Sequence, residues 1–160
     1  MKKAPLLLSI VLISTLFFNA GAQSDSGAKG EKTFLKYADE SLLVMDQAAR
    51  DMTVKGVALV AFIPGDTTII WTSKMKVSGA LGNSSANFLA IAYSKASEMA
   101  DTYKDSGSGA REILHGEFGY QGGIIKKVST GYVLAVFSGA SGEQDVEIAK
   151  AGVDSLLEHY

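Results

Sequence analysis

The distribution of hydrophobic residues along the chain predicts a first helix that begins near Asp39. From this residue onward, apolar side chains recur at the three- and four-residue spacing of one helix face. That face holds Leu42, Met45, Ala49 and Met52. Gly56 stands where a glycine commonly ends a helix. Methionines at this spacing are typical of core side chains, so we interpret both as packing residues rather than haem ligands.

Residues 57–73 predict a β-hairpin. The run 57–62 is continuously apolar, which favours a strand buried on both faces. Pro64-Gly65-Asp66 is a turn sequence. The β-prone run 67–73, which contains the only tryptophan, Trp71, then predicts the returning strand.

A second helix follows a loop of Gly, Ser and Asn at 78–84, and it ends at the Gly/Ser sequence 105–109. One side of this helix is apolar. That side holds Phe88, Ile91, Ala92, Ala96, Met99 and Tyr103. A last helix opens at Ser141, where Gln144 three residues later completes a capping box.

Between these two helices the sequence predicts a short helical turn, a loop and a hairpin. Residues 110–115 form the turn, and the loop 116–123 is dense in glycine. The runs 124–129 and 132–137 are two strands joined around Thr130-Gly131. Two hairpins favour an antiparallel sheet covered by helices, so we expect an α+β fold in a single domain over residues 38–160.

The N-terminus carries the pattern of a secretory signal peptide. Lys2 and Lys3 precede the uncharged apolar run 5–18, and Ala20-Gly21-Ala22 is a small-residue cleavage sequence. The run is shorter than the roughly 20 residues of a spanning helix. We therefore expect residues 1–22 to be removed near Ala22, a periplasmic or secreted protein, and no membrane insertion after cleavage. The polar segment 23–37 is expected to be a flexible leader.

Composition excludes several function classes. The chain has no cysteine, so neither disulfides nor a lipid-modified cysteine contribute, and a net charge of −2 offers no footprint for nucleic acid. No Gly-x-Ser-x-Gly sequence presents a serine nucleophile, which argues against a hydrolase triad. Glu143 and Asp145 in the first turn of the last helix would repel a phosphate at its N-terminus.

Few residues remain for chemistry. Glu112 and His115 would share a face of a helical turn, but a metal site needs further ligands, so the metal stays unknown. A haem iron takes His, Met, Cys or Tyr as axial ligand. The glycine-dense loop offers His115 and Tyr120, beside the flexible Gly122 and Gly123 that would let a planar ligand approach.

The residues 138–145, Ser-Gly-Ala-Ser-Gly-Glu-Gln-Asp, followed by Ala149 and Ala151-Gly152, resemble the C-terminal signature of the GlcG/HbpS family of small haem-binding-like domains. That family is related to the C-terminal domain of PduO-type proteins. Lys95-Ala96, Met75 and Gly122-Gly123 fall in matching order, and the resemblance spans residues 38–158. The chain departs from the family at 63–66 and lacks both prolines usual around Gly122-Gly123.

This resemblance implies a profilin-like α/β/α sandwich with a five-stranded antiparallel sheet. It also implies a homo-oligomer and binding of haem or a related tetrapyrrole. We therefore expect a non-catalytic binding protein for haem or a similar small hydrophobic cofactor. The alternatives are an extracytoplasmic interaction or oligomeric accessory module with a degenerate pocket, and a haem-degrading enzyme.

Overall fold

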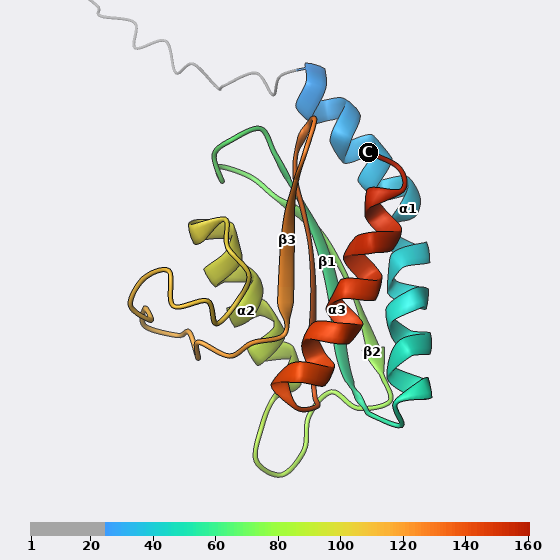
Figure 1. Cartoon of the computed structure of the whole chain (residues 1–160), viewed down its shortest axis with the longest axis vertical. Helices are drawn as coiled ribbons and strands as arrows, with labels where there is room; N and C mark the ends of the chain where they lie inside the picture. Colours follow the sequence, from blue (N-terminus) through green and yellow to red (C-terminus); the bar gives the residue numbers. More distant parts are fainter. Residues whose placement is uncertain (1–24) are drawn as a thin grey trace, which may run out of the picture.

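The computed structural model describes residues 25–160, which form a three-layer α/β/α domain (Figure 1). A four-stranded antiparallel sheet in the order β2-β1-β4-β3 makes the middle layer. Helices α1 and α3 cover one face and α2 the other. The elements are α1 (Asp25–Asp51), β1 (Gly56–Pro64), β2 (Thr72–Ser78), α2 (Phe88–Thr102), β3 (Gly123–Val128), β4 (Gly131–Ser138) and α3 (Gly142–Leu157).

Helix α1 corrects the predicted leader. Residues 25–37 are its first turns, and Phe34 and Ala38 continue the buried stripe that was predicted from Leu42 onward. Gly56 does not end the helix either. Thr53 ends it in a left-handed conformation (φ 58°), and Gly56 opens β1. The predicted signal peptide, residues 1–22, lies outside the described residues.

Strand β1 is buried on both faces, as its apolar run predicts. The returning strand, however, begins at Thr72 rather than at residue 67, and Ala61 pairs with Ser73. Residues 67–71 instead form a loop, because the Thr68 hydroxyl donates to the carbonyl of Ala100 in α2 (2.5 Å). This bond holds the loop against α2 and away from the β1–β2 ladder.

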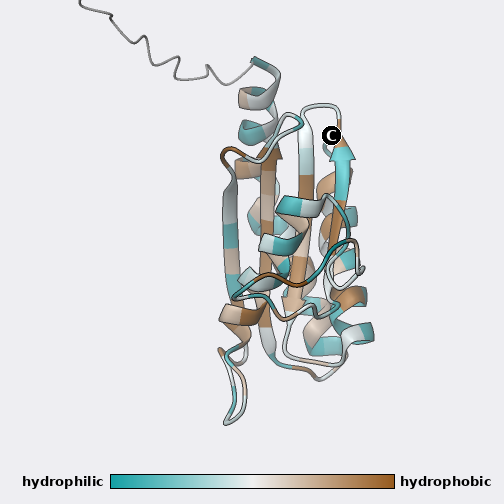
Figure 2. Cartoon of the chain, turned by 90° about the vertical axis from the view of Figure 1, so that its left-hand side faces the viewer, coloured by the Kyte–Doolittle hydropathy of each residue, from teal (hydrophilic) through white to brown (hydrophobic). Residues whose placement is uncertain are grey.

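Side chains alternate between two cores on opposite faces of the sheet. Phe62 and Val60 point toward α1 and α3, whereas Ile63 and Leu59 point toward α2. Figure 2 shows α2 and the following loop lying across the second face. This loop, between α2 and β3, is where the sequence analysis placed its candidate site.

The sheet has four strands, so the expected fifth strand is wrong. The second hairpin was predicted correctly within one residue at each end. The segment between α2 and β3 adds no strand, since Gly107, Gly109 and Gly116 adopt positive φ angles that interrupt a ladder. No helix within residues 25–160 is long and apolar enough to cross a membrane.

Candidate functional site

The loop from Tyr103 to Gly122 has no regular secondary structure, and hydrogen bonds of Arg111 attach it to α2. Arg111 donates to both carboxylate oxygens of Glu117 (2.8 Å each) and to Asp101 Oδ2 in α2 (2.7 Å). The hydrogen bonds hold the pKa of Glu117 below its usual value, against a smaller opposing effect of burial. The network fixes the loop on the C-terminal part of α2.

The predicted helical turn at residues 110–115 does not form. Gly109 and Gly116 have positive φ angles at its two ends, and Arg111 points its side chain toward Glu117. Glu112 and His115 are exposed on this loop. Within the described part of the chain, no group of three or more His, Asp or Glu side chains could hold a metal ion.

A cleft of about 450 Å³ lies where the start of α2, the end of the loop and the β4–α3 turn meet. Tyr120 is on its wall, with the ring 5.6 Å from that of Phe118 and half of its surface exposed. The full lining comprises Asn83, Ala86, Phe88, Ile91, Lys95, Gly119, Tyr120, Gln121, Ser138, Gly139, Ala140, Gly142 and Asp145. We call this the Tyr120 cleft.

The charged residues of the Tyr120 cleft are paired with each other. Lys95 Nζ donates to Asp145 Oδ2 (2.7 Å) and to the carbonyl of Phe137 (2.9 Å), and both side chains are almost fully buried. Burial lowers the pKa of Lys95, and the neighbouring Asp145 opposes that shift. Burial likewise raises the pKa of Asp145, against the opposing effect of Lys95.

Asp145 also accepts a hydrogen bond from the turn that precedes α3. Its Oδ1 accepts from the backbone N–H of Ala140 (3.0 Å). The Ser141 capping box then engages the backbone N–H groups of Ser141 and Gln144. That Glu143 and Asp145 would repel a phosphate here stays a prediction.

The structure places the four candidate residues differently. Tyr120 lines the cleft, whereas His115 lies farther back on the loop and is not part of the lining. Gly122 and Gly123 are buried behind the cleft. A Cβ on Gly122 would lie 2.4 Å from Lys95 Nζ, so this glycine gives the ion pair its room.

Sequence reasoning did not find the Lys95–Asp145 pair. One signal was present: Lys95 interrupts the apolar side of a helix, between Ala92 and Ala96, where a charged residue needs a buried partner. Nothing local identifies that partner, because Asp145 is fifty residues away and reads as a helix-capping acid.

No family model and no curated protein matches the sequence. Among solved structures, the chain is similar to the Klebsiella pneumoniae protein ORFY, described as DUF336, with 14% identity over 77% of this chain and 89% of that one (TM-score 0.53). It also aligns with the structure of a PduOC:heme complex, at 13% identity over 79% of this chain and 91% of that one (TM-score 0.49).

Because ORFY is only 14% identical to this chain, the similarity is evidence for the fold alone. The two chains share a mixed α/β architecture over most of their lengths. The resemblance drawn from residues 138–145 and 149–152 pointed to the same group of proteins. The chain therefore has the fold of a GlcG-like, DUF336 domain.

Proposed function

We propose that this domain is a non-catalytic binding protein that takes haem or a related small hydrophobic cofactor in the Tyr120 cleft. The observation that carries the proposal is the lining of this cleft. It combines a half-exposed phenol with the apolar side chains of Phe88 and Ile91. A volume of about 450 Å³ is in the range of small-molecule sites.

The lining of the Tyr120 cleft contains a side chain that could ligate a haem iron. Tyrosine is an established axial ligand of haem iron, and Tyr120 is the side chain of an iron-ligating type in the lining. The adjacent Phe118 ring extends the aromatic surface. Lys95 is already paired with Asp145, so it offers no free cation to the propionates of a haem.

The pairing of Lys95 supports the non-catalytic part of this proposal. A nucleophile needs a base within hydrogen-bond distance and a free reacting atom. The amine of Lys95 is instead hydrogen-bonded to two partners and almost fully buried. The Lys95–Asp145 pair therefore supports the cleft rather than acting on a ligand.

A haemin titration tests this function. The Soret band should sharpen and saturate at one haem per chain, and Tyr120→Phe should shift the spectrum because it removes the phenolate oxygen. His115→Ala is the matched control, since His115 lies on the same loop but outside the lining. Non-saturating spectra, or spectra that Tyr120→Phe leaves unchanged, would refute this assignment.

A second function is favoured by the surface beside the cleft. Ile113, Leu114 and Phe118 of the loop are each about half exposed or more (60%, 54% and 45%). Such a grouping marks protein interfaces more often than isolated apolar residues do. An interaction module or homo-oligomer would use this surface, and Leu114→Asp should then reduce the mass measured by sedimentation without altering the haem spectrum.

We further propose that the domain acts outside the cytoplasm. The support is the sequence pattern of residues 1–22, which lies outside the described residues. N-terminal sequencing of material from the periplasm or medium should begin at Gln23. A chain that keeps Met1 and sediments with membranes would contradict the proposal.

A further inference from the structure

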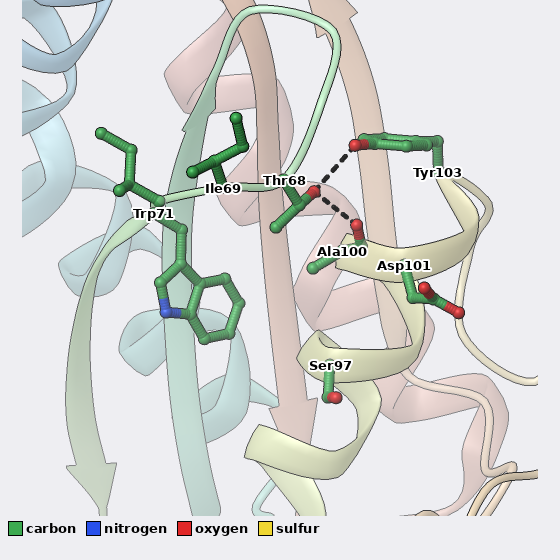
Figure 3. Close-up of a pocket in the computed structure, with 8 residues that line it drawn as sticks. Thr68, Ile69, Trp71, Ser97, Ala100, Asp101 and Tyr103 are labelled. Carbon is green, nitrogen blue, oxygen red and sulfur yellow. Dashed lines mark hydrogen bonds between the residues drawn. The ribbon is translucent and has the colours of Figure 1, made fainter. Parts of the chain in front are cut away.

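A second cleft, of about 440 Å³, lies between the β1–β2 loop and the C-terminal part of α2. It shares no lining residue with the Tyr120 cleft. Figure 3 shows the indole of Trp71 with Ile69 above it, and Ser97 and Asp101 along the helix on the other side. We call this the Trp71 cleft.

Hydrogen bonds within the protein fix the two walls of the Trp71 cleft, the β1–β2 loop and α2, relative to each other. The Thr68 hydroxyl donates to the carbonyl of Ala100 and accepts from the hydroxyl of Tyr103 (2.8 Å) (Figure 3). The Tyr103 ring in turn packs on Tyr132, with ring centroids 4.7 Å apart. The loop that carries Trp71 is therefore fixed to α2, so the position of the indole is set before anything binds.

The charge of the Trp71 cleft is acidic. Asp101 is the charged residue of the lining, and its side chain is 61% exposed. Arg111 binds its Oδ2, but that guanidinium is shared with Glu117. The carboxylates of Asp101 and Glu117 share the single guanidinium of Arg111, which leaves an excess negative charge beside the cleft. Among residues 25–160, Asp101 Oδ1 has no hydrogen-bond partner.

The remaining walls are apolar and unusually open for such side chains. Ile69 is 84% exposed and Ile70 51% exposed, although both are large aliphatic residues. Neither belongs to the two buried cores. Both line the Trp71 cleft together with the indole, so a ligand resting on the ring would have aliphatic groups nearby.

We propose that the Trp71 cleft binds an organic cation with a small apolar body, of the quaternary ammonium type. The negative face of an indole attracts such a cation more strongly than any other aromatic side chain does. The nearby carboxylate adds attraction, and Ile69 contacts the alkyl groups. An anion is disfavoured by Asp101, and a neutral ligand lacks the positive charge that both the ring quadrupole and the carboxylate attract.

The test uses choline as the probe and its neutral carbon analogue, 3,3-dimethylbutan-1-ol, as the matched control ligand. The chain has one tryptophan, so the mature protein gives a single indole N–H signal by NMR. Choline should shift this signal to saturation in the millimolar range. Equal shifts with the neutral analogue would overturn the role of charge, and no saturable shift with either ligand would overturn the site.

Two variants locate the effect. Trp71→Leu, measured by calorimetry, should weaken choline binding between about threefold and about thirtyfold, the range that a cation–π contact supplies. Asp101→Asn keeps the shape of the side chain and should weaken binding severalfold even if Trp71→Leu does not fold. Asp154→Asn, an exposed carboxylate of α3 on the other face of the sheet, is the control and should change nothing.

The outcome is separable from the haem proposal. Tyr120→Phe should leave choline binding unchanged, because Tyr120 is not part of the Trp71 cleft. If Tyr120→Phe abolishes the choline shift, the cation lies in the other cleft and the present inference is wrong.

Discussion

Lys95 of α2 and Asp145 of α3 join two helices that lie on opposite faces of the sheet, with 2.7 Å between Nζ and Oδ2. Both side chains are almost fully buried, at 2% and 5% exposure. Phe137 and Ala140 complete their hydrogen bonds, so neither charge is left without a partner. The pair lies under the Tyr120 cleft and fixes the β4–α3 turn that forms one of its walls.

Breaking this pair on one side should be costly. Lys95→Met leaves the Asp145 carboxylate buried without its cation, and we expect a loss of about 3–5 kcal/mol in the free energy of unfolding. The double variant Lys95→Met with Asp145→Asn should recover a large part of that loss, because no charge remains buried.

Urea denaturation of the three proteins measures the effect. Lys150→Met is the control, since it removes an exposed pair with Asp154 and should cost about 1 kcal/mol or less. A double variant that is less stable than Lys95→Met alone would mean that the ion pair itself, rather than the unpaired charge, determines the stability.

Ser141 is the N-cap of α3, as the sequence predicted. Its hydroxyl accepts from the N–H of Gln144, and the Gln144 side chain accepts from the N–H of Ser141 (both 3.4 Å). Ser141→Ala should lower the free energy of unfolding by about 0.5–2 kcal/mol, because one helix N–H loses its acceptor. Ser141→Thr keeps the hydroxyl and should retain most of the stability; equal loss in both variants would indicate a steric cause.

Local patterns were sufficient where the stabilising interactions are local. The capping box of α3 and the hairpin around Gly131 each depend on residues a few positions apart, and both were predicted. The β2 boundary was not, because the bond between Thr68 and Ala100 joins residues far apart in the sequence. The β-propensity of residues 67–71 is therefore overridden by a tertiary contact.

Gly30 and Gly122 both give room to neighbouring side chains, which the sequence did not predict. Gly30 made residues 23–37 resemble a linker, yet it lies inside α1, where a Cβ would come 2.2 Å from Thr130 Oγ1 and 2.4 Å from Phe62 Cζ. Its small size serves helix packing, not flexibility. Gly122 was proposed as a site of ligand approach, which stays a prediction; the structure gives it a packing role, because a Cβ there would lie 2.4 Å from Lys95 Nζ.

The candidate haem site stays a prediction. The loop was proposed because it carries His115 and Tyr120, two side chains of types that ligate haem iron, beside flexible glycines. The sequence did not decide between His115 and Tyr120, because the course of the loop depends on the ion pairs of Arg111 with Asp101 and Glu117.

Glu117 should make the free energy of unfolding depend on pH in the acidic range. Its pKa is held below 4.5 in the folded protein, chiefly by the hydrogen bonds from Arg111. Below pH 4.5 the unfolded chain takes up a proton that the folded chain still excludes, so the contribution of Glu117 is complete above this pH and is lost as the pH falls through the folded pKa.

Glu117→Gln removes this contribution. Its free energy of unfolding should fall less steeply than that of the wild type as the pH is lowered from 6 to 3, measured by urea denaturation at each pH. Glu112→Gln is the control, because it removes a carboxylate of the same loop that is not bonded to the Arg111 side chain. Parallel curves for wild type and Glu117→Gln would show that Arg111 does not stabilise the charged form.

Gly122 and Gly116 provide a matched pair of glycine substitutions. Both have positive φ angles, 126° and 90°, in which a residue with a Cβ is strained. A Cβ at Gly116 would meet nothing within 4 Å, whereas at Gly122 it would lie 2.4 Å from Lys95 Nζ and 2.9 Å from the Phe137 carbonyl oxygen. Gly116→Ala therefore measures the backbone strain alone, which we expect to cost about 1–2 kcal/mol.

Gly122→Ala adds displacement of the buried ion pair to that strain, so it should cost at least about 3 kcal/mol. Thermal denaturation of the two variants gives the difference. Combining Gly122→Ala with Lys95→Met should cost less than the sum of the separate losses, because the methionine side chain carries no charge that must stay beside Asp145. Strict additivity of the two substitutions would mean that Gly122 acts through its backbone conformation and not through the room it gives to Lys95.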